Sequence, residues 1–180
     1  MSRKIDSFKH RRQSIRWKHW DYGEAGAYFI TICTHQQVLL FDDPQLSRIA
    51  SDVWQALPNH PKSEHVSLDE FVIMPNHMHG ILIVDHQTTQ PLENNRQFEN
   101  VASGTVGRLV GTYKATVTRR INRLRGTPGV KRWQRGYWDR VIRNEQEFLA
   151  IQYYIRENPN RWSEDRENLD ALTHKMTHHR

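Results

Sequence analysis

The chain has 180 residues, of which 37% are apolar, and this length suits one domain with its own hydrophobic core. Its apolar runs are far shorter than the roughly 20 residues of a membrane-spanning helix, and its charged N-terminus lacks the apolar segment of a secretory signal. The single cysteine, Cys33, excludes an internal disulfide, so we expect a protein of the reducing cytoplasm.

The net charge of +6 is unevenly distributed along the chain. Residues 1–20 contain seven Lys or Arg and one acid, residues 105–143 contain eleven and one acid, and residues 42–100 contain nine acids and three bases. Two basic segments around a more acidic body indicate a polyanionic partner. Trp17 and Trp20 lie in the first basic segment, where aromatic rings beside cations suit unstacked bases. We therefore expect nucleic acid; the alternative is two solvated basic faces without a ligand.

Hydrophobic periodicity and turn residues divide the chain into short strands and amphipathic helices. In chain order they predict a strand at 26–35, a helix from 43 to about 58, strands at 66–75 and 77–84, a helix from 105 to about 125, an extended segment at 137–143 and a helix at 145–157. The two central strands are close enough in sequence to form a hairpin. Hairpin-linked strands with interspersed helices predict an α+β fold, an antiparallel sheet with helices packed on one face.

The predicted elements belong to one domain that spans residues 21–162. A basic arm at 1–20 precedes this domain, and a polar tail at 163–180 follows it. The stretch at about 86–104 is polar and rich in Gln and Asn, so we expect a mobile loop there.

The segment "FVIMPNHMHGILIV" places two histidines, His77 and His79, one residue apart in an apolar run. Alternate side chains of a strand share a face, so both imidazoles should point the same way, with Ile81 and Ile83 continuing that face. Two imidazoles on one strand face can bind a single metal ion. The alternative is that both rings lie at a solvent-exposed strand end, hydrogen-bonded to water or backbone. Because His-x-His alone is a weak signal, other residues must decide between a metal site and an exposed strand end.

The basic helix at 105–125 carries Tyr113 in the segment "GTYKATVTRRIN". Its spacing places Tyr113 on the apolar stripe with Val117, so one interpretation is a core tyrosine packed on the sheet. The other interpretation requires this helix to cover the sheet face that carries the two histidines. A phenol, a metal pair and several arginines would then meet, a combination suited to covalent phosphoryl transfer.

Four segments together resemble the REP-associated tyrosine transposases, bacterial relatives of the single-strand transposases of the HUH class. They cover most of residues 11–162 in the family's order: "GAYFITICTHQQVLLF", "FVIMPNHMHGILIV", "VGTYKATVTRRIN" and "YWDRVIRNEQEFLAIQYYIRENPNRW". The resemblance implies a ferredoxin-like or RRM-like sheet, with His77 and His79 as metal ligands and Tyr113 as the nucleophile. In better-known relatives a polar residue one turn after the tyrosine completes the metal site. Here that position is Val117, which cannot ligate a metal.

The resemblance also implies a reaction. The protein would be a metal-dependent endonuclease and strand transferase for single-stranded DNA hairpins of repetitive extragenic palindromes, acting in DNA transposition or repeat processing through a 5′-phosphotyrosine. Mg or Mn would be the cofactor, although imidazoles by themselves favour ions such as Zn, Ni or Cu. We expect no nucleotide cofactor, no membrane association, and a monomer or dimer. The residues expected to contact nucleic acid lie in the two basic segments: Arg11, Arg12, Arg16, Trp17, Lys18, Lys114, Arg119, Arg120 and Arg123.

Two other function classes fit parts of this pattern. A non-catalytic DNA- or RNA-binding protein, such as a repressor at repeats, would use the same sheet and basic helix but would never form a phosphotyrosine. A metal-dependent phosphodiesterase for a small substrate would use the histidine pair and water, and would need neither the basic arm nor Tyr113.

Overall fold

The computed structural model describes residues 25–60, 63, 65–85 and 106–164, which form a four-stranded antiparallel sheet and three α-helices. The elements follow in the order β1 (Gly26–Cys33), α1 (Pro44–Gln55), β2 (Val66–Met74), β3 (His77–Val84), α2 (Val106–Arg125), β4 (Trp138–Ile142) and α3 (Glu145–Glu157), with short 3-10 helices at His35–Gln37, Leu40–Asp42, Leu57–Asn59 and Pro159–Glu164. The strands lie in the order β2-β3-β1-β4, so the predicted ferredoxin-like α+β class and its hairpin are confirmed.

The predicted helices and strands all lie within a few residues of the observed ones. The basic arm at 1–20, the loop at 86–104 and the tail beyond 164 lie outside the described residues. Across the described parts of the chain, no helix combines the length and the apolar character needed to cross a membrane.

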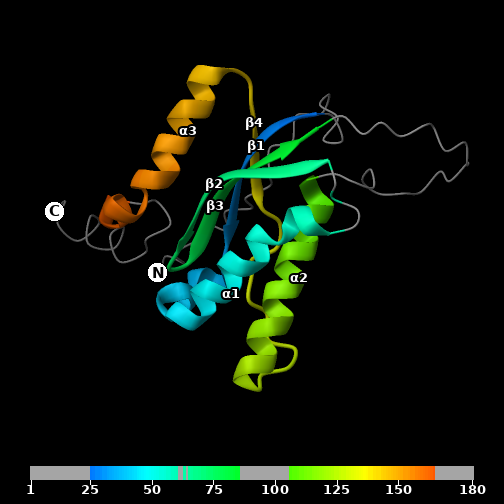
Figure 1. Cartoon of the computed structure of the whole chain (residues 1–180). Helices are drawn as coiled ribbons and strands as arrows, with labels where there is room; N and C mark the ends of the chain where they lie inside the picture. The colour runs from blue at the N-terminus through cyan, green and yellow to red at the C-terminus, as the bar shows by residue number, and fades with distance from the viewer. Residues whose placement is uncertain (1–24, 61–62, 64, 86–105, 165–180) are drawn as a thin grey trace, which may run out of the picture.

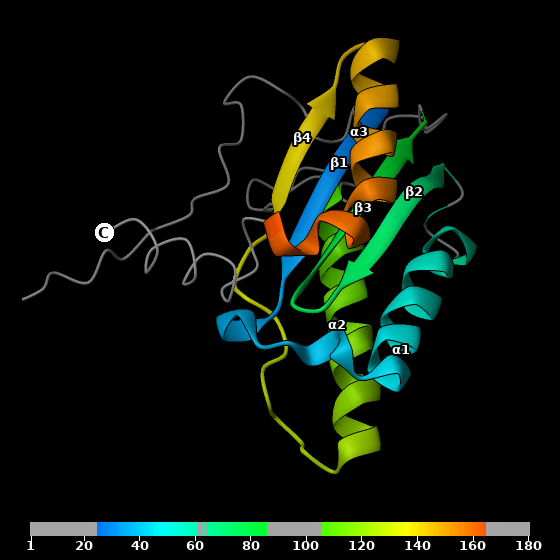
Figure 2. The same cartoon turned by 90° about the vertical axis from the view of Figure 1, so that its left-hand side faces the viewer.

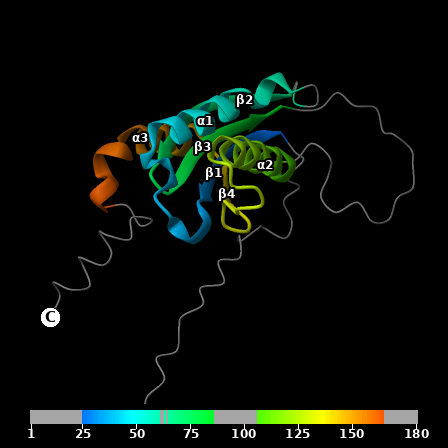
Figure 3. The same cartoon turned by 90° about the horizontal axis from the view of Figure 1, so that it is seen from below.

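Helices cover both faces of the sheet. In Figure 1 the sheet stands between α3 on one side and α1 with α2 on the other, and in Figure 2 α3 crosses in front of the strands. Figure 3 shows α1 and α2 alongside each other, consistent with the contacts between them. The predicted one-sided arrangement therefore holds for α1 and α2, whereas α3 packs on the opposite face. Both faces of β3 are apolar enough to bury a helix, which permits this arrangement.

The larger core lies between the sheet and α1 with α2. It contains alternate residues of the two central strands, such as Ile30 of β1 and Leu82 of β3, together with Trp54 of α1 and Val110 of α2. Helix α1 begins where Asp43 accepts a hydrogen bond from the Gln45 backbone N–H at 2.9 Å. This core supplies most of the buried apolar surface of the fold.

The smaller core lies under α3 and has three fully packed members, Ile81, Ile142 and Ile155. Two polar contacts join α3 to β2 where the β2–β3 register shifts between Leu68 and Phe71. Gln152 donates to Asp69 Oδ1 at 2.6 Å, and Arg156 forms a 3.4 Å ion pair with Glu70. Helix α3 is therefore anchored by fewer buried side chains than α1 or α2.

A glycine in β3 lets α1 approach the sheet closely. A Cβ atom built on Gly80 would lie 2.5 Å from Cζ2 and 3.0 Å from Cε2 of Trp54, far inside van der Waals contact. Trp54 is fully buried, so its ring cannot move aside. The contact between Gly80 and Trp54 thus sets the distance between α1 and the sheet.

We predict that Gly80→Ala lowers the free energy of unfolding by about 1–3 kcal/mol, because the added methyl group overpacks the core against Trp54. Urea denaturation monitored by Trp fluorescence measures the change. Gly111→Ala is the matched control: Gly111 lies in α2, and a methyl group added there would meet nothing within 4 Å, so the change should stabilise the helix by about 0.5–1 kcal/mol. Equal effects of the two substitutions would contradict the close contact with Trp54.

Candidate functional site

The histidine pair of β3 is buried beneath α3. His77 is 0% and His79 4% exposed, and their Nε2 atoms lie 3.1 Å apart. The predicted shared face is confirmed, because the two rings are 4.5 Å apart between centroids. The alternative of a solvent-exposed strand end is wrong. The imidazoles instead face each other inside the protein.

Each histidine has a hydrogen-bond partner at its Nδ1 atom. Asn76 Oδ1, in the β2–β3 turn, lies 2.9 Å from Nδ1 of His77. Thr31 Oγ1, directly opposite in the β1–β3 register, lies 2.8 Å from Nδ1 of His79. An amide oxygen can only accept, and a hydroxyl oxygen can also accept, so both partners suit imidazoles that carry their proton on Nδ1. The Nε2 lone pairs then converge, which is the arrangement of metal-binding histidines.

The electrostatics of the pair favour neutral rings. Burial lowers the pKa of His79 well below its ordinary value, and the neighbouring His77 lowers it further. Two neutral rings with Nε2 lone pairs 3.1 Å apart repel each other unless a proton or a cation lies between them. Two ligands each about 2.1 Å from one ion and at a right angle lie about 3 Å apart. The residues therefore fit a metal ion held by both Nε2 atoms.

A tyrosine of α3 adjoins the pair. The hydroxyl of Tyr154 lies 3.3 Å from Nε2 of His79, and the two rings are 5.3 Å apart between centroids. Phe29 of β1 stacks on His79 at 5.2 Å and meets Tyr154 edge-on at 6.0 Å. Tyr154 contacts the buried His79 and is also 43% exposed to solvent.

A buried amide lies one helical turn beyond this tyrosine. Asn158 follows Tyr154 by four residues, which places both on one side of the helix end. It is 2% exposed, and its Oδ1 has no hydrogen-bond partner among the described residues. Farther along, the ring of Trp162 lies 6.0 Å from that of His77. The segment from Tyr154 to Trp162 thus passes both histidines, with Asn158 in its middle.

No third acidic, histidine or cysteine ligand is present in the described ranges. Within them, no group of three or more His, Cys, Asp or Glu could hold a metal ion. In the segment that passes the two histidines, Asn158 Oδ1 is a buried acceptor without a partner among the described residues. An amide oxygen also suits harder ions better than imidazole does.

Tyr113 is not near the histidines, and the expectation that α2 covers their face is wrong. Its ring lies in the larger core, 5.3 Å from Trp54 and 5.6 Å from Trp133. Helix α2 packs on the even-numbered residues of β3, such as Met78, whereas the histidines occupy odd positions. Tyr113 is 0% exposed, and burial raises the pKa of its phenol far above the ordinary value, which disfavours an attacking phenolate.

The predicted nucleic-acid contacts divide into three groups. The five in the N-terminal arm lie outside the described residues: Arg11, Arg12, Arg16, Trp17 and Lys18. Lys114 donates to the backbone oxygens of Gln134 at 2.6 Å and Gly136 at 2.8 Å, so its ammonium group holds the segment between α2 and β4. The remaining three are exposed on α2 and stay predictions: Arg119, Arg120 and Arg123.

Sequence reasoning gives Tyr154 a packing role and does not single out Asn158, although a signal for both exists. The expected motif is a tyrosine followed one turn later by a polar residue. The segment "YIREN" has this spacing, whereas Tyr113 is followed by Val117. The neighbours Ile151 and Ile155 suggest a packing role for the late helix, and they do pack on the sheet. Tyr154 lies beside that apolar stripe, at the edge next to His79.

Comparison with known proteins gives a family and a fold. An uncharacterized protein of Haemophilus influenzae is 36% identical over 182 residues, an alignment that covers 94% of this chain and all of that protein. The chain belongs to the same family as that protein. No protein-family model matches the sequence.

Among solved structures, the fold of this chain matches a REP-associated tyrosine transposase bound to a REP hairpin, with a TM-score of 0.54. The match covers 81% of this chain and 73% of that one, at 17% sequence identity. The predicted resemblance to this class of transposase is therefore confirmed at the level of the fold. At such low identity the likeness says nothing about individual residues.

We predict that Tyr113→Phe leaves the protein as stable as the wild type or up to about 1 kcal/mol more stable. The substitution keeps the ring and removes a buried hydroxyl that has no partner among the described residues. The midpoint and slope of urea denaturation measure it. A loss of more than about 1 kcal/mol would mean that the hydroxyl makes a stabilising contact with a residue outside the described ranges.

Proposed function

We propose that the protein is a metal-dependent enzyme that cleaves and rejoins single-stranded DNA by transesterification, with Tyr154 as the nucleophile. The observation that carries this proposal is the 3.3 Å distance from the Tyr154 hydroxyl to Nε2 of His79. The phenol is also partly exposed, so a DNA strand can reach it. Tyr113, the nucleophile expected from the sequence, has neither property.

His77 and His79 would hold a divalent ion through Nε2, and Asn158 Oδ1 would be the third protein ligand. When bound, Mg or Mn would neutralise charge on the scissile phosphate and favour the phenolate over the phenol. Three protein ligands leave positions for water and phosphate oxygens, which these harder ions prefer. Asn76 and Thr31 would orient the two imidazoles from their Nδ1 sides.

The reaction conserves phosphodiester bonds. The Tyr154 oxygen would form a bond to phosphorus while the bond from phosphorus to the 3′ oxygen of the departing strand breaks. The phenol loses its proton, the departing oxygen gains one, and the products are a 5′-phosphotyrosine and a free 3′-hydroxyl. Attack by a 3′-hydroxyl on the phosphotyrosine reverses the step and joins DNA. Neither direction needs a nucleotide cofactor.

The substrate we propose is a hairpin formed by a repetitive palindrome, with a single-stranded flank that enters the site. Two features support it: the fold shared with a transposase solved on a REP hairpin, and the basic residues of α2. The proposal covers transposition or repeat processing, because the cleavage and joining chemistry is the same for both.

We predict that Tyr154→Phe folds and binds a labelled hairpin oligonucleotide but forms no covalent adduct in the presence of Mn. The ring and its packing remain, and only the attacking oxygen is removed. A denaturing gel separates the adduct from free DNA, and mass spectrometry should place the DNA of the wild-type adduct on Tyr154. Tyr153→Phe is the matched control, because the neighbouring tyrosine is exposed and lies about 100° away around the helix; it should react like the wild type.

Each other outcome has a definite meaning. An adduct that survives Tyr154→Phe and disappears in Tyr113→Phe would overturn the assignment of the nucleophile. Binding without any adduct, in the wild type and with Mn present, would favour the non-catalytic repressor.

We predict that Thr31→Val weakens Mn binding about 10- to 100-fold, as is typical when the hydrogen-bond partner of a metal-binding histidine is lost. Valine keeps the shape of threonine but cannot accept the Nδ1 hydrogen of His79. Titration of free Mn by electron paramagnetic resonance measures affinity without any need for activity. Thr31→Ser, which keeps a hydroxyl, should bind Mn nearly as tightly as the wild type. Equal Mn affinities of the wild type and Thr31→Val would show that Thr31 does not orient His79.

A further inference from the structure

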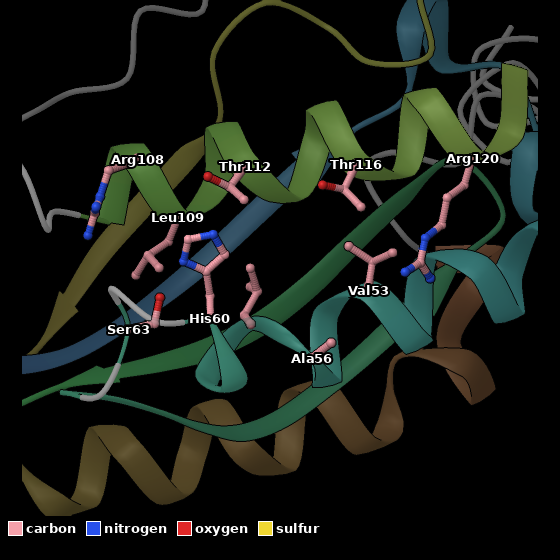
Figure 4. A pocket seen from close by; sticks show the side chains of 10 residues that line it. Val53, Ala56, His60, Ser63, Arg108, Leu109, Thr112, Thr116 and Arg120 are labelled. Atoms are coloured by element: carbon pink, nitrogen blue, oxygen red, sulfur yellow. The ribbon is translucent and has the colours of Figure 1, made fainter. Parts of the chain in front are cut away.

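A groove runs between α1 and α2 on the sheet face opposite to the histidine pair (Figure 4). It encloses a cavity of about 160 Å³. The buried side chains of Val53, Leu57 and Leu109 form an apolar floor. Arginine, threonine and histidine side chains form the rest of the lining. The proposed reaction uses none of these side chains, although Arg120 is among the residues expected to contact nucleic acid.

The polar lining contributed by α2 is a regular row. Arg108, Thr112, Thr116 and Arg120 recur every fourth residue, so they share one stripe of the helix at steps of about 6 Å, about 18 Å in all. Figure 4 shows Arg108 at one end of the groove and Arg120 at the other, with both threonines between them. A row of donors with a cation at each end matches an extended anion better than a compact one.

The chemistry of the described lining residues favours an anionic ligand over a cationic one. His60 faces the α2 row from the end of the 3-10 helix Leu57–Asn59, and the described residues that line the groove include no Asp or Glu. Guanidinium groups and hydroxyls are the groups that most often contact phosphate oxygens. Arg120 is exposed and has no ion-pair partner among the described residues.

The size of the cavity fits a segment of a polymer better than a whole small-molecule ligand. Pockets for small molecules enclose roughly 300–1,000 Å³, about two to six times the volume found here. A small groove between two helices suits a segment of a chain that extends beyond it. The apolar floor then suits the sugar carbons between charged phosphates.

We propose that this groove binds the sugar–phosphate backbone of a DNA strand, with Arg108 and Arg120 on phosphates and Thr112 and Thr116 donating between them. This inference rests on the proposed function only in taking DNA as the polyanion. The phosphate in the groove is not the scissile one, because the sheet separates the groove from Tyr154 and His79. The groove therefore adds affinity and orientation to the DNA outside the cleavage site, and reads no bases.

The test is the salt dependence of DNA binding in the Tyr154→Phe background, in which no cleavage intervenes. Fluorescence anisotropy of a labelled hairpin oligonucleotide with a single-stranded flank gives the dissociation constant at several salt concentrations. Arg108→Gln with Arg120→Gln should lower the slope of log affinity against log salt by about two units, one for each lost phosphate contact. Thr112→Val with Thr116→Val leaves the charge unchanged, so affinity should fall about tenfold with little change in slope.

Two matched controls separate the groove from general charge and from damage to α2. Arg140→Gln with Arg143→Gln removes two positive charges at the β4 edge, outside the groove, and should leave the slope unchanged. Thr118→Val alters the same helix on another side and should leave affinity unchanged. Thermal denaturation confirms that each variant folds. If the β4 pair flattens the slope as much as the groove pair, or if the threonine variants bind normally, the groove is not a DNA site.

The experiments distinguish an error in the proposed DNA-binding role of the groove from an error in the proposed reaction. Wild-type protein that forms no adduct, with groove variants that still lose binding, would refute the reaction and support the groove. Normal adduct formation by groove variants at low DNA concentration would refute the groove and support the reaction. If both proposals hold, groove variants form adduct slowly at low DNA and at the wild-type rate when DNA is saturating.

Discussion

Strand β3 is buried on both faces, and its two-residue alternation decides which side chains meet which helix. Met78 and Leu82 face α1 and α2, whereas His77, His79 and Ile81 face α3. Neighbouring strands on both sides hold the register, since β3 pairs with β1 along its whole length and with β2 on either side of the register shift. A slip of one residue would exchange the two faces and separate the histidines from Tyr154. The tight packing of Trp54 on Gly80 opposes such a slip.

The polar atoms of the candidate site are unusual for a protein interior. Buried polar groups are normally hydrogen-bonded, and leaving one unpaired costs about 1–3 kcal/mol. Here the amide oxygen of Asn158 has no partner in the described part of the chain, whereas Nε2 of His79 lies 3.1 Å from Nε2 of His77 and 3.3 Å from the Tyr154 hydroxyl. The hydrogen-bond partners of the Nδ1 atoms of both histidines, in contrast, are well placed. An unpaired acceptor in the segment that passes a buried histidine pair is expected where a ligand completes its bonding.

The sequence predicted the elements, the hairpin, the fold class and the common face of His77 and His79, because each depends on local periodicity. It could not predict which helix covers that face. Met78, Leu82 and Val84 on one side are as apolar as Ile81 and Ile83 on the other, so hydrophobicity does not distinguish the faces. The choice depends on chain crossovers between strands, which are non-local.

The expectation that Tyr113 lies over the two histidines is wrong for that reason. Helix α2 is basic and strongly periodic, so the sequence favours it as the helix that carries the nucleophile, whereas α3 has an ordinary composition. The discriminating pattern was short: a tyrosine with a polar residue one turn later, present at Tyr154 and absent at Tyr113. Asn158 acquires meaning only when the fold brings α3 across β3, because a lone buried asparagine has many structural uses.

The weak anchoring of α3 has a consequence for motion. One residue of the helix, Ile155, is fully buried, and the ties to Asp69 and Glu70 are at the surface of β2. Elements with few buried contacts open at a smaller free energy than the whole domain. We therefore expect α3, with Tyr154, to lift from the sheet at a smaller free energy than unfolding of the four strands, α1 and α2. A strand joined to that tyrosine would move with the helix, and its cut end could meet a different 3′-hydroxyl before the helix docks again.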